Sequence, residues 1–195
     1  MNNLVTYYLH RANPLPPSDA LFYQYITAQN GVFVRAENDF ASACIQVARL
    51  TDETAPLRGL QPLAGWVRLK IPRIPLALLE AAIADAQAAT TAGHLVETLN
   101  YITWGDGRYR LVKPGDQQAN PSAVTSEAVE LGQTVVMDLH SHGTMAPFFS
   151  AADNRDETRF RFYGVLGRLP AAPEWRFRLG IYGHWLEIGR EILFT

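Results

Sequence analysis

Apolar and polar residues alternate along the first third of the chain in the way that is typical of half-buried strands. Four runs carry this pattern: ALFYQYITA, VFVRA, ASACIQVARL and GWVRLKIP, at residues 20–28, 32–36, 41–50 and 65–72. Asn30-Gly31 lies between the first two runs, and this pair is a strong hairpin signal because both residues tolerate positive φ. We therefore predict a β-rich N-terminal extension over residues 1–75.

An alanine-rich segment in the middle of the chain carries the clearest helix signal. The run IPLALLEAAIADAQAATTAG, at residues 74–93, is predicted to begin as a helix near Pro75, because the missing N–H of proline is tolerated in a first turn. The helix is predicted to end at Gly93, since glycine commonly terminates helices.

Strand-like composition returns after this helix and continues to the end of the chain. The runs are HLVETLNYITW, GRYRLVKP, TVVMDLHSH, RFYGVLGRL, WRFRLGIYG and HWLEIGREILF, beginning at residues 94, 107, 134, 161, 175 and 184. A polar, turn-rich stretch at 114–132 interrupts them, and a short helix is predicted to open at Ser150. Residues 76–195 are therefore expected to form an α/β core with a mostly antiparallel sheet.

Composition and charge exclude several classes of protein. With 195 residues, 48% of them hydrophobic, the chain can bury a substantial core, and its net charge of −2 gives no overall attraction to polyanions. Nucleic acid is therefore not an expected partner. A membrane is not expected either, since no apolar run approaches the roughly 18 residues that a membrane span needs. We expect a soluble cytoplasmic protein.

Two residue types that could carry chemistry are predicted to be structural. Cys44, the single cysteine, alternates with apolar residues in a predicted strand and is expected to be a core thiol. Six arginines interleave with aromatic residues in the last third of the chain. They are expected on the solvated faces of strands: Arg155, Arg159, Arg161, Arg168, Arg176 and Arg178.

Two histidines one residue apart end the apolar run TVVMDLHSH. Because successive strand side chains alternate between faces, His140 and His142 are expected to point the same way. Two imidazoles on one face can bind one metal ion together. Taken by itself, such a pair is more often found on an exposed strand surface.

Ser150 and Asp153 follow at the predicted start of a short helix. Ser-x-x-Asp at this place is a helix-capping pattern, so capping alone would account for both residues. The spacing His-x-His-x7-Ser-x2-Asp, however, brings a strand end and a helix start together, which makes Asp153 a candidate third ligand. Three protein ligands leave a fourth position for water, as in catalytic rather than structural zinc sites.

This spacing matches, position by position, the JAMM motif of the JAB1/MPN/Mov34 zinc metalloisopeptidases. The longer string DLHSHG…FFSAAD…YGVLGRL resembles the bacterial JAB branch, which includes PRTRC system protein A and the JAB proteases of bacterial ubiquitin-like conjugation operons. The resemblance extends over residues 75–195. It implies a cytidine-deaminase-like α/β fold, with a curved, mostly antiparallel sheet and flanking helices. It also implies one zinc ion held by His140, His142, Asp153 and a water.

The same resemblance requires a glutamate on the strand after the first helix, and Glu97 occupies that position. It implies that Glu97 takes a proton from the attacking water and passes it to the leaving amine, while Ser150 donates a hydrogen bond to the developing oxyanion. Without the motif, Glu97 would be an ordinary solvated strand residue. Three other glutamates are poorer candidates, one inside the helix and two in the polar stretch: Glu80, Glu127 and Glu130.

The implied function is that of a deubiquitinase-like hydrolase, a zinc-dependent isopeptidase or peptidase that cleaves after the C-terminal tail of a ubiquitin-like protein. Its partners would be that protein and its conjugates, together with E1- and E2-like proteins of the same operon. The polar stretch at 114–132 lies where relatives carry an insertion that clamps the tail. The alternative is a non-catalytic MPN-like scaffold or binding module in a larger complex.

Two neighbouring families fit the sequence less well. The string HSHGTM differs from the HNHPSG that follows the equivalent strand in the RadC-like branch. Nucleotide deaminases need His-x-Glu and Pro-Cys-x-x-Cys, and this chain has neither.

Overall fold

The computed structural model describes residues 3–50, 57–91, 94–114 and 134–195. Residues 115–132, which include Glu127, Glu130 and nearly all of the predicted tail clamp, therefore lie outside the described residues. Within the described ranges, no helix is long and apolar enough to cross a membrane.

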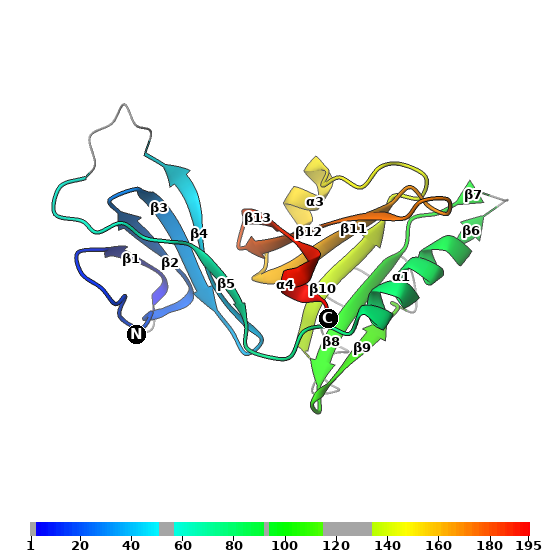
Figure 1. Ribbon diagram of the computed structural model, residues 1–195, viewed down its shortest axis with the longest axis horizontal. Coiled ribbons are helices and arrows are strands. Elements are labelled where there is room, and N and C mark those ends of the chain that lie inside the picture. Colours follow the sequence, from blue (N-terminus) through cyan, green and yellow to red (C-terminus); the bar gives the residue numbers. More distant parts are fainter. Residues whose placement is uncertain (1–2, 51–56, 92–93, 115–133) are drawn as a thin grey trace. The chain divides into compact units, whose positions relative to one another are not determined.

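The chain forms two compact units, and each combines segments that are distant in sequence (Figure 1). The first unit contains Met1–Pro72, Thr158–Phe160 and Gly180–Leu186, and the second contains Arg73–Glu157, Arg161–Leu179 and Glu187–Thr195. The predicted division into a β-rich extension at 1–75 and a core at 76–195 stays a prediction.

The first unit is built on a five-stranded sheet whose strands follow chain order. The strands are β1 (Asn3–Leu9), β2 (Ala20–Ala28), β3 (Gly31–Glu37), β4 (Ala41–Arg49) and β5 (Trp66–Leu69). The last four match the predicted runs, and each of them pairs antiparallel with the next one along the chain. Strand β1 was not among the predicted elements, and it pairs parallel to β2 at the edge of the sheet.

The hairpin between β2 and β3 differs from the prediction by one residue. Its two turn residues are Gln29 and Asn30, while Gly31 already pairs with Ala28 inside the sheet. Gly31 has a φ of 151°, and a Cβ there would come within 2.2 Å of the Ala48 carbonyl oxygen. The glycine is therefore needed for close approach to β4 and not for the turn itself.

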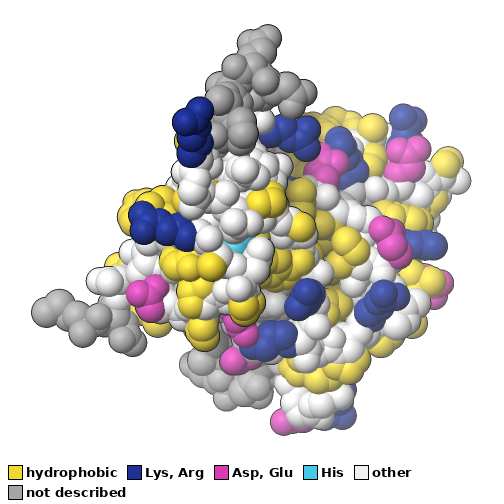
Figure 2. All heavy atoms as spheres, turned by 60° about the vertical axis from the view of Figure 1, so that its left-hand side comes forward, with side chains coloured by type: hydrophobic (Ala, Val, Ile, Leu, Met, Phe, Trp, Pro, Cys, Tyr) yellow, Lys and Arg dark blue, Asp and Glu magenta, His cyan; other side chains and the backbone are white. Residues whose placement is uncertain are grey.

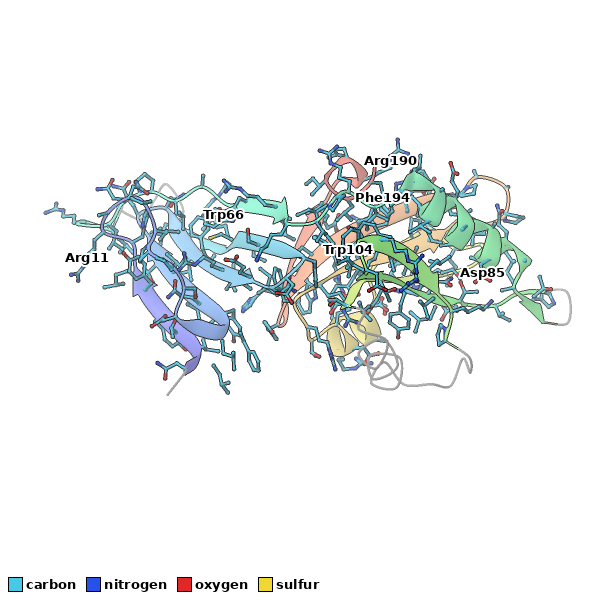
Figure 3. All side chains as sticks on the ribbon, turned by 90° about the horizontal axis from the view of Figure 1, so that it is seen from below. Arg11, Trp66, Asp85, Trp104, Arg190 and Phe194 are labelled. Atoms are coloured by element: carbon cyan, nitrogen blue, oxygen red, sulfur yellow. The ribbon has the colours of Figure 1, made fainter. Side chains whose placement is uncertain are left out.

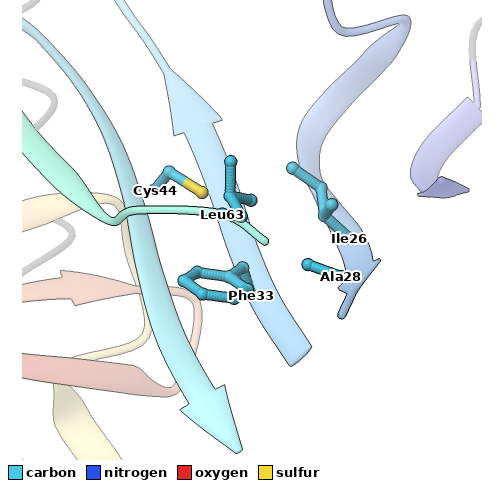
Figure 4. Packing of buried hydrophobic residues seen from close by; sticks show 5 residues of the cluster. All are labelled: Ile26, Ala28, Phe33, Cys44 and Leu63. Atoms are coloured by element: carbon cyan, nitrogen blue, oxygen red, sulfur yellow. The ribbon is translucent and has the colours of Figure 1, made fainter. Parts of the chain in front are cut away.

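Apolar side chains from three strands and the segment before β5 form a core on one side of this sheet. Figure 4 shows the cluster, which contains Ile26, Ala28, Phe33, Cys44 and Leu63. Cys44 is fully buried, as predicted for a core thiol, and burial raises its pKa to about 12. A thiol in this state is an inert apolar group at neutral pH.

The second unit is built on most of a six-stranded mixed sheet with the order β13-β12-β11-β10-β8-β9, of which Gly180–Leu186, at the end of β12 and the start of β13, belong to the first unit. The strands are β8 (Leu99–Gly105), β9 (Arg108–Val112), β10 (Thr134–Ser141), β11 (Arg161–Gly167), β12 (Glu174–Ile181) and β13 (His184–Ile188). Strand β10 lies in the middle and pairs antiparallel with β8 and parallel with β11. The result is a mixed α/β structure with two main sheets and few helices.

Helix α1 (Leu76–Ala88) begins where the sequence predicted, with Pro75 as its N-cap, but it ends before Gly93. Ala89 is already extended, and β6 (Thr90–Thr91) pairs with β7 (His94–Leu95). The β-branched threonines favour this short strand pairing over continuation of the helix.

One face of α1 is fixed to the sheet beside β8 and β9 (Figures 1 and 3). The helix buries Leu79, Ala82 and Ala86. Its Asp85 accepts hydrogen bonds from Asn100 at 3.1 Å and Lys113 at 2.7 Å. These contacts fix α1 to β8 and to the residue that follows β9.

The chain ends in a short helix that was predicted as a strand. The run HWLEIGREILF contains β13 and then α4 (Arg190–Leu193), with Gly189 as the N-cap. Ile74 and Phe194 form a parallel bridge, so the C-terminus is held beside the start of the second unit.

Candidate metal centre

The two histidines lie at the end of the central strand β10. His140 is in the strand and aligns with Leu99 of β8 and Val165 of β11. His142 follows one residue past the strand, where its backbone N–H still donates to the Leu166 carbonyl at 2.8 Å. The predicted alternation is confirmed, because the two Nε2 atoms face each other at 3.2 Å.

Asp153 comes from α3 (Ala151–Asp156), the short helix predicted to open at Ser150. Ser150 and Asp153 form a reciprocal capping box. The Ser150 hydroxyl accepts from the Asp153 N–H at 3.1 Å, and the Ser150 N–H donates to Asp153 Oδ2 at 2.5 Å. The other oxygen, Oδ1, lies 3.4 Å from His140 Nε2. One carboxylate therefore caps the helix with one oxygen and presents the other to the histidines.

Two of the three spacings between the possible ligand atoms fit a single zinc ion. One ligand atom from each of His140, His142 and Asp153, here called the His-His-Asp group, lies within 4.8 Å of the others. Tetrahedral zinc with bonds of about 2.0–2.1 Å places its ligand atoms about 3.3–3.4 Å apart. The observed 3.2 and 3.4 Å agree with that spacing, and nitrogen and carboxylate oxygen are ligands that zinc prefers.

The protonation states of the group also suit a metal ion. Burial, with smaller contributions from His142 and Arg178, lowers the pKa of His140 to about 4, although Asp153 acts in the opposite direction. Burial tends to raise the pKa of Asp153. Its hydrogen bonds with Ser150, together with the electrostatic effect of His140 and His142, nevertheless hold that pKa below its ordinary value. At neutral pH, His140 is therefore a neutral ligand and Asp153 an ionised one, as metal binding requires.

Glu97 lines the same cavity as His140 and Asp153. It was predicted on a strand, but it lies outside one. The cavity has a volume of about 300 Å³ and is bordered by Glu97, His140 and Asp153, among other residues. Glu97 is exposed and lies in the connection between β7 and β8. Of the other candidates, Glu80 is on the exposed side of α1 and does not border this cavity.

Buried hydrogen bonds hold the connection that carries Glu97 against the His-x-His segment. Ser141, between the two histidines, points to the opposite face of β10 and is fully buried. Its hydroxyl accepts from the Thr98 N–H at 3.0 Å and from the Thr98 hydroxyl at 3.1 Å, and its N–H donates to the Thr98 carbonyl. Thr98, which follows Glu97, is thus joined to Ser141, which lies between the two histidines.

Two of the arginines predicted on solvated faces are buried beside this site. Arg161 binds Asp138 at 2.7 Å, and Arg178 binds Glu157 at 2.5 Å. Both carboxylates border the cavity, and both arginine side chains are 7% exposed. The sequence pattern could not show this, because alternation separates the two faces of a strand without saying which face is covered. On the face drawn in Figure 2, the described basic side chains lie among acidic and apolar ones.

The loop between His142 and Ser150 adds apolar side chains at the site. Gly143 has a φ of 57°, which turns the chain away from β10. The Phe148 ring meets the His142 ring edge-on, with centroids 4.6 Å apart, and so restricts the histidine's orientation. Phe148 and Met145 are also among the most exposed large apolar residues in the described chain.

Comparison with known proteins identifies the domain that carries this site. The family described as prokaryotic homologs of the JAB domain matches residues 75–180, which is more than half of the chain. The chain belongs to this family. The matched range contains Glu97, the whole His-His-Asp group and Ser150, so the candidate site lies within the JAB domain.

Other comparisons add little to this assignment. The solution structure of a protein from Desulfitobacterium hafniense is similar with 16% identity and a TM-score of 0.41, over 63% of this chain and 90% of that one. No curated protein matches the JAB-domain chain.

Proposed function

We propose that this protein is a JAMM-type zinc metalloprotease that cleaves the bond after the C-terminal tail of a ubiquitin-like protein. The observation that carries the catalytic part is the His-His-Asp group, in which His140 lies at zinc-ligand spacing from both other residues, with Glu97 on the cavity that His140 and Asp153 border. The substrate class is supported by the resemblance of the motif to the bacterial JAB proteases. Deconjugation and precursor processing are both within this proposal.

Each residue of the site has a definite part in the proposed reaction. Zinc held by the group would polarise the scissile carbonyl and lower the pKa of a water ligand toward neutrality. Glu97, on the cavity wall, would accept the proton of the attacking water and pass it to the leaving amine. The Ser150 oxygen accepts the Asp153 N–H, which leaves the hydroxyl hydrogen available to donate to the substrate oxygen.

The alternative is a non-catalytic scaffold that keeps the JAB fold and has lost chemistry. A scaffold has no need of a complete set of reactive side chains, yet Glu97, Ser150 and the three possible ligands are all present. Glu97, His140 and Asp153 border one cavity, and Ser150 caps the helix that carries Asp153, which together favour the hydrolase.

A direct test uses the purified full-length chain. Metal analysis should find one zinc ion per chain. A ubiquitin-like protein from a neighbouring gene, made with a C-terminal extension, should be cut after its tail by the untreated enzyme. The same substrate should remain intact when the enzyme has been treated with a chelator. Zinc without cleavage of either this fusion or a lysine-linked conjugate would favour the scaffold.

Ser150→Ala should lower kcat by about 10²- to 10³-fold, the usual loss for one oxyanion donor. The residue also caps α3, and loss of an N-cap to alanine costs about 0.5–2 kcal/mol of stability. Ser150→Gly separates the two roles, because glycine at an N-cap costs only a few tenths of a kcal/mol. Equal losses of kcat in both variants indicate oxyanion donation. Near-normal turnover in Ser150→Gly would leave only the capping role.

A further inference from the structure

Helix α3 carries two functional groups but has little to hold it in place. It contains six residues, none of them buried, and its N-cap is Ser150. Helices this short are unstable on their own, so most of their stability must come from tertiary contacts. Asp153 nevertheless has to present one oxygen at a fixed distance from His140, since metal sites tolerate displacements of only about 0.5 Å.

A single buried guanidinium contacts the chain at both ends of this helix. Arg178 lies on β12 and places its Cζ 3.8 Å from the ring centroid of Phe149, the residue directly before the N-cap. Its Nε and Nη2 lie 2.6 and 2.5 Å from Oε2 of Glu157, which is the C-cap. Both side chains of this ion pair are 7% exposed, so neither contact is a solvated surface interaction.

Glu157, at the C-terminal end of α3, is also bonded directly to the possible ligand Asp153. The backbone N–H of Glu157 donates to the Asp153 carbonyl at 2.8 Å. Burial raises the pKa of the Glu157 carboxyl, while the guanidinium of Arg178 acts in the opposite direction. A stacked ring on one side and an ion pair on the other fix the planar guanidinium, and through it the helix, against β12.

We infer that Arg178 is a positioning residue, which holds α3 by its two ends so that Asp153 and Ser150 stay in register with the histidines. The inference rests on the proposed function for the identity of the metal site. Stability alone is a poor reason for such a pair, because a buried ion pair is often no more stable than well-packed apolar residues. What the pair provides here is a fixed position for a helix that has no core of its own.

Zinc affinity of the full-length chain, measured by competition with a chromophoric chelator, tests this directly. Arg178→Met keeps the length of the side chain and removes both contacts. It should fold, as judged by circular dichroism, and bind zinc more weakly, with the loss of about 10- to 100-fold that is usual for a direct partner of a metal ligand as the upper bound. Its cobalt-substituted form should also lose the visible spectrum of the wild-type site.

Two further variants separate positioning from general destabilisation. Phe149→Leu removes only the ring under the guanidinium and leaves no unpaired charge. It should therefore fold and weaken zinc binding, even if Arg178→Met does not fold. Leu179→Ala is the matched control: it is the next residue in β12, it is fully buried and it points to the opposite face. It should lower the melting temperature and keep wild-type zinc affinity.

Wild-type zinc affinity in both Arg178→Met and Phe149→Leu would overturn the positioning role, and so would an equal loss in Leu179→Ala. A wild-type protein that binds no zinc at all would instead overturn the proposed metal site, and this inference with it.

Discussion

Replacing His140 with alanine should abolish zinc binding while leaving the chain folded. The imidazole is one of three possible ligands, and its Nε2 lies 3.2 Å from His142 Nε2 and 3.4 Å from Asp153 Oδ1. Zinc content should fall from one ion per chain to none, and cleavage should fall to background. Asp153→Ala should have the same effect on zinc. Because it also removes half of the capping box, it should be the less stable of the two.

Thermal unfolding gives an independent measurement of the same loss. A ligand that binds only the folded state stabilises it by about 2.7 kcal/mol at a concentration of 100 times Kd. Added zinc should therefore raise the melting temperature of the metal-free wild type and leave that of His140→Ala unchanged. His184→Ala, in the other compact unit, is the control and should retain both zinc and the shift. Full zinc content in both His140→Ala and Asp153→Ala would refute the assignment of ligands.

Glu97→Gln should have the opposite profile, with normal zinc content and little turnover. The amide has nearly the shape of the carboxylate but cannot accept a proton, so the loss in kcat should be about 10²- to 10⁴-fold, the range for a general acid–base residue. Because Glu97 is exposed and outside any strand, the substitution should change the melting temperature little.

The matched control for this variant is Glu80→Gln. It makes the same chemical change on the exposed side of α1, away from the cavity, and should leave turnover unchanged. Normal turnover in Glu97→Gln would mean that another carboxylate of the cavity is the base. Asp156 would then be examined first, since it is exposed and borders the same cavity.

Much of the candidate site could be predicted from short-range pattern. The period of two in a strand places His140 and His142 on one face, and the capping pattern places Ser150 at a helix start. These are local consequences of backbone geometry, and the structure confirms both. Capping and metal binding were alternatives for Asp153 at the level of sequence. The structure shows that they are compatible, because the carboxylate has two oxygens with different neighbours.

The sequence by itself determined the elements whose signals are local. Strand β2, the start of α1 at Pro75 and the helix opening at Ser150 all follow from periodicity and capping residues. Where a segment could adopt either of two structures, only the tertiary structure decided which one formed. The helix stops before Thr90 because that segment finds a strand partner, and β1 forms because β2 is beside it.

Burial was likewise decided only by the tertiary structure. Arg176 and Arg178 lie two residues apart on one strand and have the same sequence signal, yet the first pairs with Glu187 in solvent and the second is buried under α3. Glu97 borders the same cavity as His140 because Thr98, in the connection before β8, is joined to Ser141 of β10, which is 43 residues away in sequence. Alternation assigns a side chain to a face, but what covers that face depends on how distant segments pack.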